Sequence, residues 1–232
     1  DAGDWRPLFP EINRGKLGIT LNFQAPRGLD LARHLVAVSD VVIENFAAGV
    51  MERHGLGYES LRQIKPDIVV VSMPGYGRTG PIAGHIGFGQ NLMAYVGLSV
   101  LWGYPDSPLE ARPKMHYVDF LSAAAASAAV MAALEYRSQT GRGQCIELAQ
   151  VETLASTLGV PYLDKLVNGH SPLPVGNNSI SMAPHGCYPC RGDDQWCVIS
   201  CATEEQWGNL CKVLEEPSWT GNPMFGSLRS RI

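Results

Sequence analysis

The sequence has 232 residues, a formal net charge of −4 and 45% hydrophobic residues, enough for one large domain or two small ones with a sizeable core. Its 17% charged residues, 25 glycines and 16 prolines exclude disordered, collagenous and coiled-coil chains. The sequence contains no basic run that would predict nucleic-acid binding and no apolar stretch near the ~20 residues of a membrane span.

The first part of the chain alternates between helix and strand patterns. Apolar residues recur at helical spacing over residues 28–38, and a second, shorter helix is predicted over 58–64. Apolar runs at 41–43 and 68–71 predict strands, and the second run has the composition of a strand covered on both faces. This alternation predicts an α/β fold with a parallel sheet and crossover helices.

Three further helices and one more strand are predicted before residue 170. The helices span residues 90–100, 119–137 and 151–167, and the strand spans 145–148. Residues 1–170 would therefore form a large domain. Gly141 follows the second of these helices, where a glycine commonly ends a helix.

Composition places a domain boundary near residue 175. Residues 171–183 are rich in Gly, Asn, Ser and Pro and form a predicted linker. Beyond it, 184–232 would begin a smaller α+β domain with a hairpin over 186–201 and a final helix over 204–214. Thr203 is the expected N-cap of that helix.

The loop at residues 74–81 is a candidate binding site because of its position. It follows a predicted parallel strand, and ligands of open α/β sheets bind beyond the carboxyl ends of the strands. Gly75 and Gly77 lie in this loop, although their spacing is too short for a dinucleotide fingerprint. An ordinary surface turn is the alternative.

Asp119 and His85 are the candidate catalytic side chains. Asp119 begins the long helix, so it is either an N-cap residue or a carboxylate that the helix keeps ionised for nucleophilic attack. His85 follows the 74–81 loop, so it is either a general acid or base or a surface histidine.

Five of the six cysteines lie between residues 187 and 211. Only Cys187 and Cys190 have the spacing of a zinc knuckle, and a zinc ribbon needs two such pairs. We therefore expect no metal site and interpret the cysteines as buried free thiols in a reducing cytoplasm.

Several segments together resemble the class III CoA-transferase family, which includes formyl-CoA transferase, carnitine CoA-transferases and α-methylacyl-CoA racemase. The resemblance spans nearly the whole chain, and the order of the segments makes it specific. The segments are Asn13–Lys16, Asp40–Phe46, Gly49–Tyr58, Ser72–Pro81, Tyr117–Phe120, Thr140–Gln144, Pro184–Gly186 and Gly192–Trp196.

This resemblance implies a fold and an assembly. Family members have a Rossmann-like large domain and a smaller domain, and two chains interlock as a homodimer. They are considerably longer than this chain, which resembles a fragment that lacks both ends of the family's chain. We therefore expect the partner to be a second copy or the remainder of the polypeptide, and we expect exposed apolar surface.

The resemblance also assigns residues. Asp119 matches the family's catalytic aspartate, and Asn45, Arg53 and Leu21 match residues that bind CoA in formyl-CoA transferase. Gln24 stands where that relative has a lysine. By analogy, backbone N–H groups near Gly75 and Gly77 would stabilise oxyanions, and His185 would line the active site.

The implied activity is transfer of CoA between an acyl-CoA and a free carboxylic acid, through a covalent aspartyl-CoA intermediate. One alternative is an acyl-CoA racemase in which Asp119 and His85 move the α-proton; Ile86 occupies a position where that relative has an aspartate. Another is a non-catalytic CoA-binding subunit. Arg112 either pairs with a second carboxylate of the acid or is a surface residue, and the sequence leaves the identity of the acid open.

Overall fold

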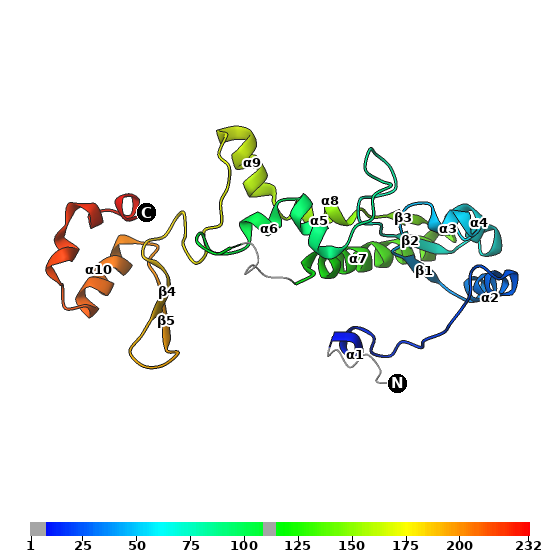
Figure 1. The fold of residues 1–232 in the computed structure, drawn as a ribbon, viewed down its shortest axis with the longest axis horizontal. Helices are drawn as coiled ribbons and strands as arrows, with labels where there is room; N and C mark the ends of the chain where they lie inside the picture. Colours follow the sequence, from blue (N-terminus) through cyan, green and yellow to red (C-terminus); the bar gives the residue numbers. More distant parts are fainter. Residues whose placement is uncertain (1–7, 109–114) are drawn as a thin grey trace. The chain divides into compact units, whose positions relative to one another are not determined.

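A computed structural model describes residues 8–108 and 115–232 (Figure 1). Strands β1 (Val41–Glu44), β2 (Val69–Ser72) and β3 (Cys145–Glu147) form a parallel sheet in that order. Each strand is reached through helices, as a parallel connection requires. The α/β class with a parallel sheet and crossover helices is therefore confirmed.

Strand β2 is the centre of the sheet and of its core. Its four residues are all buried, as the uninterrupted apolar run predicts. Helices α2 (Pro26–Ala37) and α4 (Tyr58–Ile64) contribute Ala32, Val36 and Leu61 to the same buried cluster. The short helix α3 (Val50–Arg53) lies between β1 and α4.

Two predicted helices are each divided in two. The helix predicted over 90–100 is α5 (Gly89–Tyr95) followed by α6 (Leu98–Leu101), because Gly97 adopts a left-handed conformation with φ +85°. The helix predicted over 151–167 is α8 (Gln150–Ser156) followed by α9 (Gly159–Asn168). Pro161 has no N–H to continue the α8 hydrogen-bond ladder, which explains the second break.

Helix α7 spans Tyr117–Thr140, 24 residues, with Asp119 in its first turn. By length and composition alone it is apolar enough to cross a membrane, with a mean hydropathy of 1.6. By mean hydropathy, the expectation that no apolar stretch approaches the length of a membrane span is therefore wrong. The scattered serines hardly lower the mean hydropathy of this alanine-rich helix. The measure is weak, since core helices of proteins without a membrane segment meet it as well.

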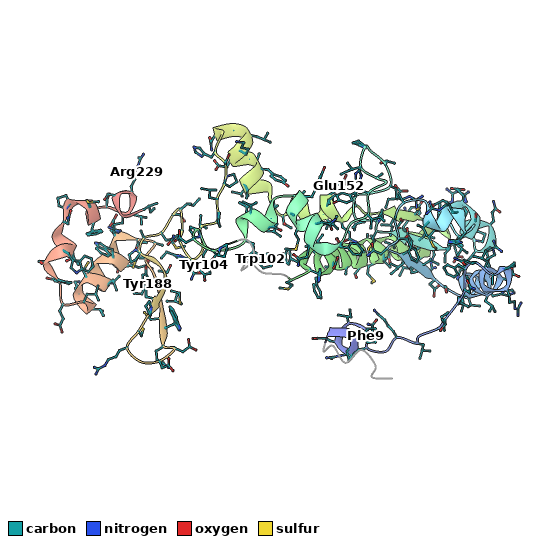
Figure 2. All side chains as sticks on the ribbon, viewed as in Figure 1. Phe9, Trp102, Tyr104, Glu152, Tyr188 and Arg229 are labelled. Atoms are coloured by element: carbon teal, nitrogen blue, oxygen red, sulfur yellow. The ribbon has the colours of Figure 1, made fainter. Side chains whose placement is uncertain are left out.

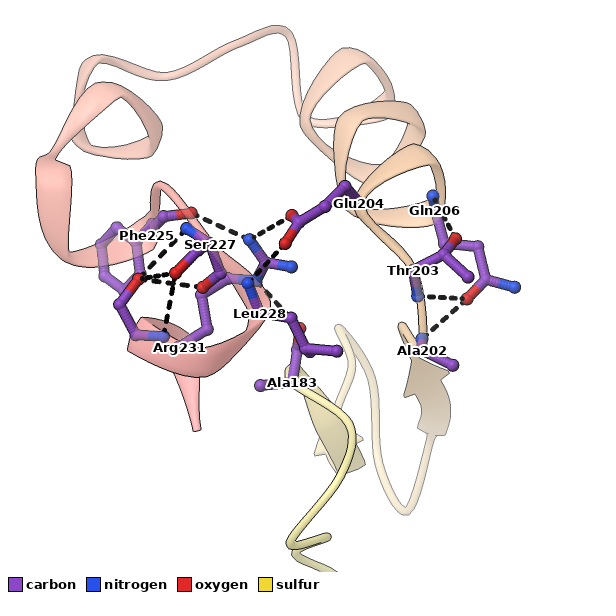
Figure 3. A network of polar contacts seen from close by, with 10 residues as sticks. Ala183, Ala202, Thr203, Glu204, Gln206, Phe225, Ser227, Leu228 and Arg231 are labelled. Atoms are coloured by element: carbon purple, nitrogen blue, oxygen red, sulfur yellow. Dashed lines mark hydrogen bonds and ion pairs between the residues drawn. The ribbon is translucent and has the colours of Figure 1, made fainter.

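The last part of the chain matches the predicted hairpin and helix. Strands β4 (His185–Pro189) and β5 (Trp196–Ser200) pair antiparallel, and α10 (Glu204–Val213) follows. Thr203 caps α10, because its hydroxyl accepts a 3.2 Å hydrogen bond from the Gln206 N–H (Figure 3). The remaining elements are α1 (Leu8–Ile12), the 3₁₀ turns η2 (Ser218–Gly221) and η3 (Pro223–Phe225), and α11 (Leu228–Arg231).

A buried arginine holds the C-terminal elements together (Figure 3). The Arg231 side chain is 2% exposed and pairs with Glu204 at 2.8 Å. Its Nε donates to the Ala183 carbonyl at 3.1 Å, and its guanidinium lies 4.8 Å from the centre of the Trp207 ring. These bonds lower the pKa of Glu204, chiefly through the Leu228 backbone N–H and then through Arg231.

Contacts between residues divide the chain into two compact units. The first holds the residues up to Gly87 together with Phe120–Glu152, and the second holds Phe88–Asp119 with Thr153–Ile232. The sheet belongs to the first unit, and the β4–β5 hairpin to the second. The 171–183 linker lies inside the second unit, and the domain limits at 170 and 184 stay predictions.

Large apolar side chains are exposed, as expected for this chain. Val167 on α9 is 75% exposed and Ile180 is 82% exposed. Together with other residues they line an open apolar cavity of about 830 Å³ in the second unit.

Candidate active site

The carboxyl ends of the three strands form a polar row. Glu44, Ser72 and Glu147 stand side by side in the sheet register. The Ser72 hydroxyl donates to one Glu44 oxygen, and the other Glu44 oxygen accepts from the Phe46 N–H at 2.8 Å. These bonds fix the turn after β1 that carries Asn45.

Arg78, from the loop after β2, ties this row to helix α3. Its guanidinium contacts Glu52 at 2.5 Å and Glu147 at 3.1 Å. Partial burial raises the pKa of Glu52, but the hydrogen bond from Arg78, a backbone hydrogen bond and the charges of Arg78 and Arg53 together outweigh it and hold that pKa below its ordinary value. Because Glu52 precedes Arg53 on α3, the Arg78 clamp also fixes the backbone that carries Arg53.

The three predicted CoA-binding residues all lie in the first unit. Asn45 is exposed, and its Oδ1 accepts from Gln150 Nε2 at 2.9 Å. Arg53 folds back toward Gly49, the residue before α3, since a Cβ at Gly49 would lie 3.3 Å from its Nη1. Leu21 packs against the buried cluster beside β1 and β2.

The loop after β2 is a defined turn. Gly77 has φ +84°, which favours glycine, and its N–H donates to the Pro74 carbonyl at 3.3 Å. The Gly75 carbonyl accepts from the Val151 N–H at 3.0 Å. The Gly77 N–H is therefore occupied within the turn, so its oxyanion role would require the turn to open.

His85 is exposed at the end of that loop. Its Nδ1 lies 3.1 Å from the Ile82 carbonyl, and its ring meets Tyr76 edge-on at 6.0 Å between centroids. A carbonyl oxygen can only accept, so Nδ1 carries the proton and Nε2 is the basic nitrogen.

Asp119 lies at the third position of α7, in the second unit. The helix begins two residues earlier than predicted, so Asp119 is not the N-cap, and no described residue donates a hydrogen bond to its carboxylate. Its Oδ2 is 4.0 Å from His116 Nδ1. Partial burial raises the pKa of Asp119, and His116 opposes that rise.

The start of α7 is packed closely by its own unit. Trp102, labelled in Figure 2, meets Tyr117 edge-on, with 5.7 Å between ring centroids. Gly89, the first residue of α5, lies against the site: a Cβ there would be 2.6 Å from His116 Nδ1 and 3.2 Å from Asp119 Oδ2. Because Gly89 has no side chain, the His116 and Asp119 side chains can occupy this space.

Sequence reasoning missed His116, Gly89 and Gln150. His116 precedes Asp119 by three residues, a spacing that places side chains together at a helix start. Gln150 follows the third parallel strand, so the rule that singled out the 74–81 loop would also have found it. Gly89 touches residues far along the chain, and no local signal predicts that contact.

The described contacts of these groups include neither of the other two predicted site residues. His185 lies at the start of β4 in the second unit, where its Nδ1 contacts the Asn177 carbonyl at 2.7 Å. Arg112 falls outside the described residues.

The cysteines differ from the expected buried thiols. All six are free, but Cys187, Cys190 and Cys197 are exposed, because the β4–β5 hairpin has few residues packed over it. Hydrogen bonding with Cys197 raises the pKa of the Cys190 thiol. In the described ranges, no group of three or more His, Cys, Asp or Glu side chains is placed to hold a metal ion.

We predict that the purified protein carries no stoichiometric zinc, because two exposed cysteines at knuckle spacing supply only half of a tetrahedral site. Elemental analysis of protein purified without chelator tests this. One zinc per chain that disappears in a Cys187→Ser variant would contradict the prediction and identify a metal knuckle.

The chain belongs to CoA-transferase family III, whose profile matches residues 2–232. Among curated relatives, succinyl-CoA–D-citramalate CoA-transferase of Chloroflexus aurantiacus is 30% identical over 223 residues, covering 96% of this chain and 55% of the relative. Succinyl-CoA:glutarate CoA-transferase of Homo sapiens is 28% identical over 240 residues, covering 100% of this chain and 54% of the relative. The chain thus spans little more than half the length of these relatives.

A solved structure agrees with the fold. The crystal structure of a CaiB/BaiF family protein from Brucella suis matches with a TM-score of 0.82 and 32% sequence identity. The match covers 94% of this chain and 57% of that chain. The resemblance inferred from the sequence segments is therefore confirmed at the level of the family.

Proposed function

We propose that this protein transfers CoA between an acyl-CoA thioester and a free carboxylic acid, with Asp119 as the nucleophile. The observation that carries the proposal is the Asp119 carboxylate itself. It is half-exposed, accepts no hydrogen bond from a described residue, and lies beside His116 in a chain of the CoA-transferase family. Such a carboxylate keeps its lone pairs available for attack.

The reaction would proceed in balanced steps. The Asp119 carboxylate attacks the donor thioester carbon, which forms a mixed anhydride and releases CoA thiolate. The thiolate attacks the aspartyl carbonyl, which forms aspartyl-CoA and releases the donor acid. The acceptor carboxylate then reverses both steps, so the thioester is conserved and Asp119 returns to its starting form.

The CoA would bind at the carboxyl end of the sheet through Asn45, Arg53 and Leu21. The names of relatives pair succinyl-CoA with citramalate, malate and glutarate. We therefore propose that short dicarboxylates are the acids that accept and release CoA. A homodimer, or a complex with a second subunit, and a cytoplasmic location belong to the same proposal.

One observation favours a second candidate, an acyl-CoA racemase. The Ile82 carbonyl holds His85 Nδ1, which leaves Nε2 basic and able to take a proton. The transferase remains the better supported function, because the relatives' names describe CoA transfer.

The decisive experiment is an assay of the intact protein, as its gene encodes it, with succinyl-CoA and a panel of labelled carboxylic acids. Transfer of CoA to one of the acids is the expected result. Borohydride added during turnover should convert the Asp119 thioester to an alcohol, which changes the mass of one peptide only. Exchange of the α-proton with deuterated water, without transfer, would instead establish the racemase.

Arg53→Ala is expected to weaken CoA binding. Loss of an ionic hydrogen bond to a phosphate costs about 1.5–3 kcal/mol, or roughly 10- to 150-fold in the dissociation constant. Calorimetric titration with CoA measures the change. Arg62→Ala, which removes another exposed arginine from the neighbouring helix α4, is the control, and equal affinities of both variants would refute the assignment.

Transfer should also fail in acid, because only the ionised Asp119 is a nucleophile. Burial raises the pKa of Asp119, so kcat/KM should fall with decreasing pH at values above the ordinary aspartate range. His116 opposes this rise, so His116→Asn should move the acid limb to higher pH. His34→Asn, at an exposed position of helix α2, should leave the acid limb of the pH profile in place. An acid limb that His116→Asn does not move would contradict the assignment.

A further inference from the structure

Gln150 connects the carboxyl ends of the parallel strands. It is the first residue of α8, directly beyond β3, and only 4% of its surface is exposed. Its Nε2 donates to two acceptors, the Met73 backbone carbonyl at 3.0 Å and Asn45 Oδ1 at 2.9 Å. Met73 follows β2 and Asn45 follows β1, so one buried amide bridges the ends of the neighbouring strands.

The Met73 carbonyl determines the direction of both side-chain amides. A backbone carbonyl only accepts, so the Gln150 atom facing it must be the nitrogen. The second N–H of that nitrogen then points at Asn45 and requires an acceptor there, which is Oδ1. The opposite orientation would place Gln150 Oε1 against two acceptors. In the orientation observed, Oε1 is buried without a donor among the described residues.

The consequence falls on Asn45. Because Oδ1 faces the buried Gln150, the two N–H groups of Nδ2 are the donors that this exposed side chain can offer a ligand, and no described residue accepts from them. The Arg53 guanidinium lies near Gly49, which belongs to the same connection between β1 and α3 as Asn45. Two amide donors on a connection that also faces a cation favour an anionic acceptor such as a phosphate oxygen.

We infer that Gln150 is a positioning residue that holds the Asn45 side chain with its amide N–H groups outward, as donors to a phosphate oxygen of CoA. The inference rests on the proposed function, because it takes CoA as the ligand of Asn45. Gln150 itself is buried and does not touch the ligand.

A double-mutant cycle on the intact protein tests the inference, with CoA affinity measured by calorimetry. Gln150→Met keeps the volume but cannot donate, so CoA should bind about five- to tenfold more weakly. In an Asn45→Ala background the same substitution should have no further effect, since Gln150 acts through Asn45. Additive losses, or unchanged affinity of Gln150→Met, would overturn the inference.

Steady-state kinetics distinguish a positioning role of Gln150 from a general loss of protein structure. Gln150→Met should raise KM for the acyl-CoA and leave kcat nearly unchanged, because the lost hydrogen bond is made equally in the ground and transition states. A misfolded or loosened protein would lose kcat as well, and that outcome counts against the inference.

A measurement on the unmutated protein avoids dependence on folding of the variant. In ¹⁵N-labelled protein, both Gln150 side-chain amide protons should be protected from exchange, and the Asn45 amide protons should become protected only when CoA is added. Asn45 protons that stay exposed at saturating CoA overturn the inference alone. Failure of the unmutated protein to bind CoA overturns the proposed function.

Discussion

Asp119→Asn is expected to reduce CoA transfer by roughly 10⁴-fold or more, as loss of a covalent nucleophile does in other enzymes. The amide keeps the size of the carboxylate but is a far poorer nucleophile. Folding should survive, because no described residue depends on the carboxylate for a hydrogen bond. Transfer rates and thermal unfolding of the intact protein measure the two effects separately.

Glu205→Gln provides the matched control for Asp119→Asn. Glu205 is also an exposed acid in the first turn of a helix, α10, so its removal reports the general cost of neutralising such a charge. It should transfer CoA at the normal rate. Near-normal transfer by Asp119→Asn would end the covalent mechanism, whereas loss of both transfer and folding would assign Asp119 a structural role.

Gly89→Ala is expected to reduce transfer by about 100-fold, the loss that a displacement near 1 Å in a catalytic group can cause. The new Cβ would lie 2.6 Å from His116 Nδ1 and 3.2 Å from Asp119 Oδ2. The imidazole and the carboxylate can rotate away, but His116 Cβ would be 3.1 Å from the new Cβ and is fixed to the backbone, so the start of α7 must also shift by a few tenths of an ångström. The melting temperature should therefore change far less than the rate of transfer.

Gly208→Ala is the control for the added methyl group. Gly208 lies in α10, and a Cβ there would meet no other atom within 4 Å. An alanine at such a helical position stabilises by about 0.5–1 kcal/mol and should leave transfer unchanged. If Gly89→Ala also transfers at the normal rate, the close packing around Asp119 has no catalytic role.

The sequence predicts the sheet well, because local patterns determine its parts. The predicted limits of α4 are those observed, and the strand pattern at 68–71 lies within one residue of β2. A short apolar run between two amphipathic helices is nearly always a buried strand in a parallel α/β fold. The division at Gly97 was missed because an isolated glycine is compatible with both an intact helix and a break.

The site is only partly predictable, for a physical reason. Asn45 and the 74–81 loop follow strands, and the carboxyl-end rule applies to each strand separately. Which side chains meet there depends on the register between strands, which pairs Glu44 with Ser72 and Ser72 with Glu147. Contacts such as that of Gly89 with Asp119 depend on packing between elements far apart in the sequence.

The position of β2 has a consequence for how the protein opens. All four of its residues are buried, and both of its edges are paired to neighbouring strands. Its backbone amides can therefore exchange with solvent only when the whole sheet separates, whereas the four-residue helix α3 can fray locally. Ser72 and the loop that begins at Pro74 thus extend from the slowest-opening segment, so partial unfolding elsewhere leaves this end of the proposed CoA site intact.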